Sequence, residues 1–188
     1  DGLMESRAMR TEEEIEQAMR RHGSAVYVVA LAQTRCREDA QDVAQDVFVS
    51  LLTCGKSFRD DDHLRAWLLR ATINRCADVY RSPWKRKVQA MPEGESDIGG
   101  VEAGPEDAAL RELERTQVWR ALKRLPESLC ATAVLFYIEE HSVREIADIM
   151  ECRQGTVRVR LARARRQMRD VLEGTAEPSE RGGAYEAL

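Results

Sequence analysis

Apolar residues recur at intervals of three and four through the first half of the chain, which is the spacing of one face of an α-helix. The pattern predicts three helices, over residues 11–35, 38–52 and 63–81. Thr11 and Glu14 have the spacing of a capping box that starts the first helix. The apolar face of that helix is expected to comprise Ile15, Met19, Val26, Val29 and Ala30. The inner face of the third is expected to comprise Leu64, Trp67, Leu68, Ala71 and Val79.

The second half of the chain has the same helical spacing, in four further segments. They are expected over residues 108–125, 127–139, 142–150 and 153–172. Few β-branched residues alternate with polar ones, and only 5% of the residues are aromatic, so the composition favours helices over sheets. The predicted fold class is therefore all-α.

The two halves are separated by a segment that is poor in large apolar residues. It reads MPEGESDIGGVEAGPED over residues 91–107, and such a composition buries too little surface to order itself. We therefore expect two small helical domains joined by a flexible acidic linker. The boundaries that follow are a domain over 10–87, a linker over 88–107, a second domain over 108–173 and a disordered tail over 174–188.

Composition narrows the class of protein. The net charge is −4, but the charges are unevenly placed. The five cysteines have no CxxC spacing and no paired histidines nearby, which indicates reduced thiols and no metal site. We find no phosphate-binding glycine loop and no nucleophile motif, so neither an enzyme nor a cofactor is expected. No apolar run has the length of a membrane span and no signal core begins the sequence, so we expect a cytoplasmic protein without membrane insertion.

The most specific local pattern is a helix-turn-helix in the second half. Ser142 and Glu145 form a capping box that starts a short helix, and a break at Glu151 and Cys152 precedes a longer one. Seven arginines and no acidic residue lie between Arg153 and Arg169. An arginine-rich helix alone is more often a solvated surface, but the capped helix before it favours a recognition helix that enters the major groove of DNA.

The two faces of this last helix differ in chemistry. Val157, Leu161, Ala164 and Met168 are expected to pack inward. Arg163 has the hydrogen-bonding geometry to read a guanine, and small apolar side chains are suited to thymine methyl groups. The expected DNA-binding residues are Arg153, Gly155, Thr156, Arg158, Val159, Ala162, Arg163 and Arg166.

Longer stretches on both sides of the linker resemble a known family. LPESLCATAVLFYIEEHSVREIADIMECRQGTVRVRLARARRQMRD resembles the fourth conserved region of sigma-70 factors, in the extracytoplasmic-function (ECF) group. RRHGSAVYVVALAQTRCREDAQDVAQDVFVSLL and HLRAWLLRATINRCADVYR are similar to the second region. The resemblance implies an alternative sigma factor, which binds core RNA polymerase and directs it to promoter DNA, and whose expected regulator is an anti-sigma factor.

The resemblance also implies roles for residues of the first domain. The helix over 38–52 is expected to dock on a coiled coil of the polymerase through Asp42, Gln45, Asp46 and Val49, with Val43, Val47 and Phe48 inward. From the residues alone, an ordinary amphipathic core helix is the simpler interpretation. The third helix and its extension are expected to bind the melted minus-ten element through Arg70, Asn74, Arg75, Arg81, Trp84 and Lys85. The last helix of the chain is expected to bind the minus-thirty-five element.

The sequence departs from the family at three places. Glu140 and His141 stand where the family has a glycine and an apolar residue, so we expect that corner to be either looser or differently packed. Arg153 replaces a common proline. The acidic loop over 60–62 is expected either to sharpen the selection of a base or to repel DNA.

Two other classes of protein remain open. One is a sigma-like decoy that binds an anti-sigma factor without initiating transcription. Such a decoy has no need of the arginines on the last helix. The other is a simple helix-turn-helix repressor, which leaves the similarity of the first domain without an explanation.

Overall fold

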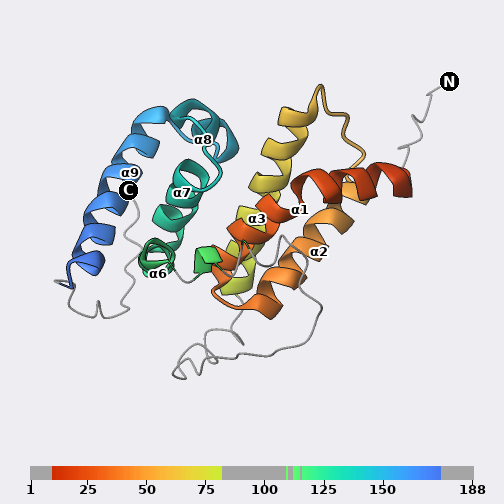
Figure 1. Cartoon of the computed structure of the whole chain (residues 1–188). Helices are drawn as coiled ribbons and strands as arrows, with labels where there is room; N and C mark the ends of the chain where they lie inside the picture. The colour runs from red at the N-terminus through yellow and green to blue at the C-terminus, as the bar shows by residue number, and fades with distance from the viewer. Residues whose placement is uncertain (1–9, 82–108, 110–111, 115, 175–188) are drawn as a thin grey trace.

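The computed structural model describes residues 10–81, 109, 112–114 and 116–174, and this part of the chain is helical without any strand (Figure 1). Three helices form an N-terminal unit: α1 (Glu12–Thr34), α2 (Arg37–Thr53) and α3 (Asp61–Arg81). Four more form a C-terminal unit: α6 (Gln117–Lys123), α7 (Glu127–Tyr137), α8 (Val143–Ile149) and α9 (Gln154–Leu172). The all-α prediction is confirmed. The expected linker, and the tail beyond Gly174, lie outside the described residues.

The helix starts follow from local hydrogen bonds. Thr11 and Glu14 form the predicted capping box on α1, and Ser142 and Glu145 form the one on α8. The expected helix over residues 108–125 is interrupted, because Thr116 caps α6 by accepting a hydrogen bond from the Trp119 amide. The Thr116 hydroxyl also donates to the carbonyl of Leu113, so this side chain stabilises a break that apolar spacing cannot reveal.

The corner between α7 and α8 is closed rather than loose. Glu140 adopts the left-handed conformation, with φ of 56°, although it is not a glycine. The His141 amide donates to the carbonyl of Leu135 at 2.9 Å, and the Glu139 amide donates to Val134 at 3.1 Å. These bonds satisfy the carbonyls of Val134 and Leu135 near the end of α7. The hydrogen bonds argue against a looser corner and leave the other expectation, a differently packed one.

The N-terminal unit packs α1 against both α2 and α3. Val43 and Val47 of α2 are buried as predicted, and so is Phe48. On α3 the buried residues are Leu68, Leu69, Thr72 and Cys76, whereas Leu64, Trp67, Ala71 and Val79 are only half-buried. The predicted inner face of α3 was therefore partly wrong, because α3 also packs against α8 of the C-terminal unit.

The two units lie directly against each other, with α7 and α6 on α1 and α8 on α3 (Figure 1). All seven residues from Val28 to Thr34 are at most 7% exposed. Seven consecutive residues make two turns, so this half of α1 is buried on every side. The buried side chains of both units accordingly form one continuous cluster.

Candidate nucleic-acid interface

The helix α9 lies on the side of the C-terminal unit that faces away from α1–α3 (Figure 1). Val157, Leu161, Ala164 and Met168 are its buried residues, as predicted. The capped helix α8 crosses it through Ile146, Ala147 and Ile149, which are also buried. The sequence thus forms a helix-turn-helix. One face of α9 packs into its core, and the opposite face is exposed to solvent.

The outward face of α9 carries positive charge that is only partly paired within the described part of the chain. The eight predicted DNA-binding residues are all exposed: Arg153, Gly155, Thr156, Arg158, Val159, Ala162, Arg163 and Arg166. Within the described part of the chain, Arg153, Arg163 and Arg166 have neither a hydrogen-bond nor an ion-pair partner. Unpaired guanidinium groups on one helix face are available to phosphates and to guanine edges.

Gly155 has no structural role in the packing of α9. A Cβ atom at this position would meet nothing within 4 Å. Glycine in a helix lowers the stability of the fold relative to alanine, so its presence here suggests a role in binding. Without a side chain at this position, another molecule can approach the backbone of the first turn of α9 closely.

The predicted minus-ten residues on α3 are not gathered on one open surface. Asn74 is exposed and lines a hollow of about 420 Å³ between α2 and α3, whose lining is both polar and apolar. Arg75 lines the same hollow and is hydrogen-bonded to Asp46, while Arg81 is exposed and lies 3.5 Å from Asp78. Arg70 instead extends to the C-terminal unit, where it contacts the end of α8. Trp84 and Lys85 lie outside the described residues.

The aromatic and acidic residues near the start of α3 have structural partners. Trp67 is half-buried, with its ring 5.6 Å from that of Phe58, which fits a packing role. In the acidic loop, Asp60 accepts a hydrogen bond from the His63 amide at 2.7 Å. Asp61 contacts His22 at 3.0 Å and Arg21 at 3.3 Å. Burial alone would raise the pKa of Asp61, but these two partners outweigh burial and lower it below its ordinary value. Two of the three acids therefore stabilise the fold.

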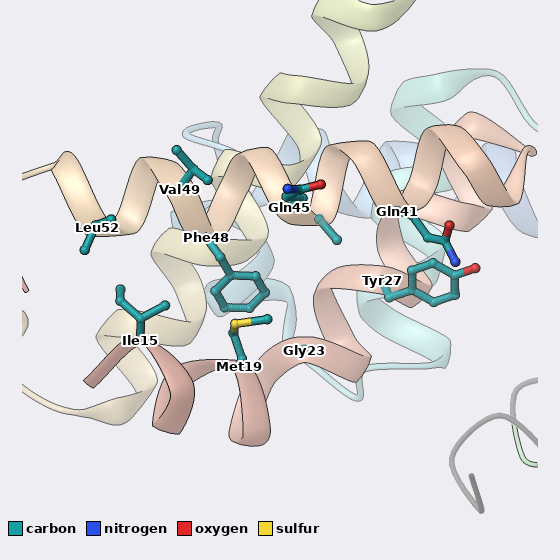
Figure 2. A pocket seen from close by; sticks show the side chains of 10 residues that line it. Ile15, Met19, Gly23, Tyr27, Gln41, Gln45, Phe48, Val49 and Leu52 are labelled. Atoms are coloured by element: carbon teal, nitrogen blue, oxygen red, sulfur yellow. The ribbon is translucent and has the colours of Figure 1, made fainter. Parts of the chain in front are cut away.

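A second surface is formed where α2 meets α1. The predicted docking residues Asp42, Gln45 and Val49 are exposed on α2, and Asp46 is half-exposed. Beside them is an apolar groove with a volume of about 430 Å³ (Figure 2). Phe48 and Met19 face each other at its centre, with Ile15 and Leu52 at one end and Tyr27 and Gln41 at the other.

The sequence pattern did not reveal this groove. Met19 was expected inside the core, but it is 50% exposed on the groove wall. Gly23 also lines the groove, and a Cβ atom there would meet nothing within 4 Å. A glycine in the middle of a helix, one turn after a methionine, was the available signal of an open surface.

Comparison with known proteins agrees with these features. Residues 18–86 match the family model of sigma-70 region 2, and residues 115–168 match that of sigma-70 region 4. The ECF RNA polymerase sigma-E factor of Escherichia coli is 34% identical over 147 residues, which cover 74% of this chain and 75% of that protein. The sigma-H factor of Pseudomonas aeruginosa is 33% identical over 144 residues, 72% of this chain and 74% of that one. The ECF sigma factor SigE of Mycolicibacterium smegmatis is 29% identical over 157 residues, and this chain spans 61% of its length.

Solved structures show the same fold. The sigma factor RpoE of Bartonella quintana, in complex with the anti-sigma factor NepR, superposes with a TM-score of 0.66 at 22% identity, covering 86% of this chain and 98% of that one. CnrH, in complex with the cytosolic domain of CnrY, gives 0.63 at 26% identity, covering 88% and 92%. Among the described helices, none is both long and apolar enough to cross a membrane. The chain belongs to the sigma-70 family of RNA polymerase sigma factors, in its ECF group.

Proposed function

We propose that this chain is an alternative sigma factor that binds core RNA polymerase and directs it to a specific set of promoters. The observation that carries the proposal is the exposed arginine face of α9, on which Arg153, Arg163 and Arg166 have no partner among the described residues, next to a capped α8. This geometry suits entry of α9 into the major groove, where the first turns of a recognition helix meet the base edges. A protein of this family that does not bind DNA has no need of such a face.

The exposed residues of α9 are proposed to have two roles, contact with bases and contact with phosphates. Arg163 lies in the middle of the exposed face and is suited to pair with a guanine of the minus-thirty-five element. Val159 is 51% exposed and, with Ala162, suits contact with thymine methyl groups. Arg153, Arg158 and Arg166 are suited to phosphates, which position the helix without reading sequence.

The α3 helix is proposed to bind the minus-ten element. Asn74 and Arg75 lie together on a hollow with polar and apolar lining, which suits contact with an unstacked base and its phosphate. Arg70 and Arg81 are proposed to contact the DNA backbone, and Trp84 and Lys85 are proposed to bind the same element. This assignment requires Arg70 and Arg75 to leave their present partners.

The polymerase is proposed to dock on α2 and on the groove beside it. Asp42 and Asp46 offer negative charge, and Val49 is 54% exposed. Apolar surface at the centre, with charged and polar side chains around it, is the usual composition of a specific protein interface.

An anti-sigma factor is the proposed regulator. Two solved structures with this fold are complexes with an anti-sigma factor or with the cytosolic domain of a second protein. As a partner of RNA polymerase, the chain is proposed to act in the cytoplasm, without a catalytic role of its own.

Binding and initiation can be tested together. The purified chain is titrated into core RNA polymerase, and transcription is measured on fragmented genomic DNA with and without the chain. A saturable complex and new transcripts are expected. A folded chain that forms neither, but binds an anti-sigma factor, would overturn the proposal in favour of a decoy.

A further inference from the structure

Arg10 connects the start of α1 to the α2–α3 loop, which comprises residues 54–60. One terminal nitrogen of Arg10 donates to the carbonyl of Leu51 at 3.0 Å and to the sulfur of Cys54 at 3.2 Å. Its other terminal nitrogen donates to the carbonyl of Lys56 in the loop. The last carbonyls of a helix have no partner within the helix and carry partial negative charge, so a cation is favoured at the end of α2. One guanidinium group therefore holds both the end of α2 and the loop that follows it.

The ring of Phe58 extends this contact from the loop to α3. The guanidinium carbon of Arg10 lies 4.7 Å from the centroid of the ring, which is within the range of a cation–π interaction. His63 and Trp67 of α3 also pack against Phe58, with ring centroids 5.3 and 5.6 Å away. The loop is thus held both by Arg10 and by the first turns of α3.

The position of Arg10 is itself fixed by the start of α1. Arg10 directly precedes Thr11, which forms the capping box with Glu14. The two side chains of the box accept hydrogen bonds from the backbone amides of Glu14 and Thr11, at 3.2 and 2.8 Å. Because the backbone beside Arg10 is already ordered, its side chain loses less conformational entropy when it binds the loop.

Two exposed cations lie in the loop that Arg10 holds. The side chains of Lys56 and Arg59 have neither a hydrogen-bond nor an ion-pair partner among the described residues. Two of the three acids that follow do have partners, since Asp60 caps the first turn of α3 and Asp61 pairs with side chains of α1. The loop therefore presents unpaired positive charge to solvent.

The loop adjoins the hollow between α2 and α3. Trp67, Ala71 and Asn74 are four and three residues apart, so they share one face of α3. Trp67 contacts the loop through Phe58, while Ala71 and Asn74 line the hollow. On α2, Ser50 lines the hollow from the last turn before the loop. The hollow and the loop thus follow one another along the same face of α3.

We propose that Arg10 is a positioning residue for recognition of the minus-ten element. It fixes the α2–α3 loop so that Lys56 and Arg59 extend the binding surface that begins at the hollow. The inference rests on the proposed function of α3. A single strand that leaves the hollow along this face meets the loop cations, which are suited to its phosphates. Discrimination between bases requires groups that are held in place, and Arg10 supplies this without contacting DNA, since its donors are taken up by the loop.

Three substitutions separate the role of Arg10 from a general effect of charge. Arg10→Ala removes the guanidinium, and Arg10→Lys keeps its charge but not its planar fork of donors. Arg20→Ala is the matched control. Arg20 lies on α1, is exposed, and pairs only with Glu16 one turn away among the described residues.

Hydrogen exchange tests the positioning without reference to DNA. Exchange of the amides of residues 54–60 is measured by mass spectrometry in each free chain, and thermal unfolding is followed in parallel. Release of the loop is expected to speed exchange by about tenfold in Arg10→Ala, by less in Arg10→Lys, and not in the Arg20→Ala control. Exchange as slow in Arg10→Ala as in the control would overturn the inference and leave the proposed sigma activity untouched.

Promoter selection tests the consequence for the minus-ten element. Each chain is combined with core RNA polymerase, and transcription is measured on one mapped promoter and on its single-base variants in both elements. Arg10→Ala is expected to lower discrimination among the minus-ten variants by about fivefold and to leave minus-thirty-five discrimination unchanged. Arg10→Lys should restore part of the loss. Unchanged minus-ten discrimination, or equal losses at both elements, would overturn the positioning role. Absence of specific starts with the unaltered chain would instead count against the proposed function.

Salt dependence tests the loop cations. The complex with core polymerase is titrated with a fluorescent single strand that carries the minus-ten sequence of the same promoter, at several salt concentrations. Replacement of both Lys56 and Arg59 by alanine should reduce the slope of log K against log salt by about 1.4, since each phosphate contact on a single strand contributes about 0.7. Both side chains are exposed, so the fold is expected to persist. An unchanged slope would show that the loop does not contact the strand and would overturn the inference.

Discussion

Arg75 of α3 donates two hydrogen bonds to a single carboxylate oxygen of Asp46 on α2, at 2.8 Å from Nε and 2.6 Å from a terminal nitrogen. The pair joins a residue proposed to contact the minus-ten element to one proposed to contact the polymerase. Both side chains are nearly half-exposed, so the pair contributes little to stability, about 0.2–1 kcal/mol. We therefore expect the pair to affect the binding of DNA and polymerase more than the stability of the fold.

Asp46→Asn should separate these two effects. The free energy of unfolding in urea is expected to change by less than about 1 kcal/mol, because the pair is solvent-screened. Affinity for core polymerase should fall, while the freed Arg75 strengthens binding of the free chain to non-specific duplex DNA. A loss of several kcal/mol in stability would show that the pair is structural and would contradict this assignment.

Asp42→Lys tests the docking surface without disturbing an ion pair. Asp42 is exposed on α2, and the described chain gives it no ion-pair partner. Charge reversal is expected to weaken polymerase binding at least tenfold, measured by competition with a labelled sigma factor. Glu38→Lys, one turn earlier on the same helix, is the control and should have a much smaller effect. Equal effects at the two positions would place the docking surface elsewhere.

Gly23→Ala should make the protein more stable and less able to bind polymerase. Alanine in a helix interior is favoured over glycine by roughly 0.5–1 kcal/mol, and the new methyl group meets no neighbour within 4 Å. The same methyl group enters the apolar groove beside Met19 and Phe48 (Figure 2). Ser24→Ala, on an exposed neighbouring position, should leave polymerase affinity unchanged. Unimpaired docking of the Gly23 variant would exclude this part of the groove.

Arg163→Ala should change the sequence preference of α9. The loss of a guanine contact is expected to cost about 1–3 kcal/mol of discrimination at one base pair, measured on promoter variants. Arg165→Ala is the control, since Arg165 is hydrogen-bonded to the Tyr137 hydroxyl at 2.9 Å. An unchanged base preference across all single-base promoter variants would show that Arg163 does not contact a base.

The stability of the folded protein should depend on pH through His141. Burial and the charge of Arg65 lower the pKa of His141 below its ordinary value of 6.5, although Glu145, Glu139 and Asp62 oppose this. The unfolded chain therefore binds a proton more readily, so the free energy of unfolding falls as pH drops below about 6.5 and is level above it. Urea unfolding at pH 7.5 and 5.5 should show a smaller fall for His141→Gln. The same fall in both chains would assign the pH dependence to other groups.

Much of the local structure was predictable because it depends on neighbouring residues. The capping boxes at Thr11 and Ser142 follow from a spacing of three residues. The core of α9 follows from its helical spacing, and all of the arginine face proposed there is exposed. Such patterns are complete within one helix and need no knowledge of its surroundings.

The errors arose where distant segments meet. Leu69 and Thr72 were missed on α3 because that helix packs against two units rather than one. The residues from Val28 to Thr34 are buried on every side of α1, because this part of the helix also packs against α7 of the other unit. Arg70 appears in sequence as a DNA-binding residue, but its position at the end of α8 depends on tertiary contact. Residues 84 and 85, like the linker, lie outside the described structure, so those expectations stay predictions.

The central claim is tested most directly by mapping transcript starts. The purified chain is combined with core RNA polymerase and fragmented genomic DNA, and the 5′ ends of the transcripts are sequenced. The account predicts discrete starts that share two separated upstream motifs, and a change in the upstream motif alone when Arg163 is replaced by alanine. Starts no different from those of core polymerase alone, with a folded chain, would contradict it.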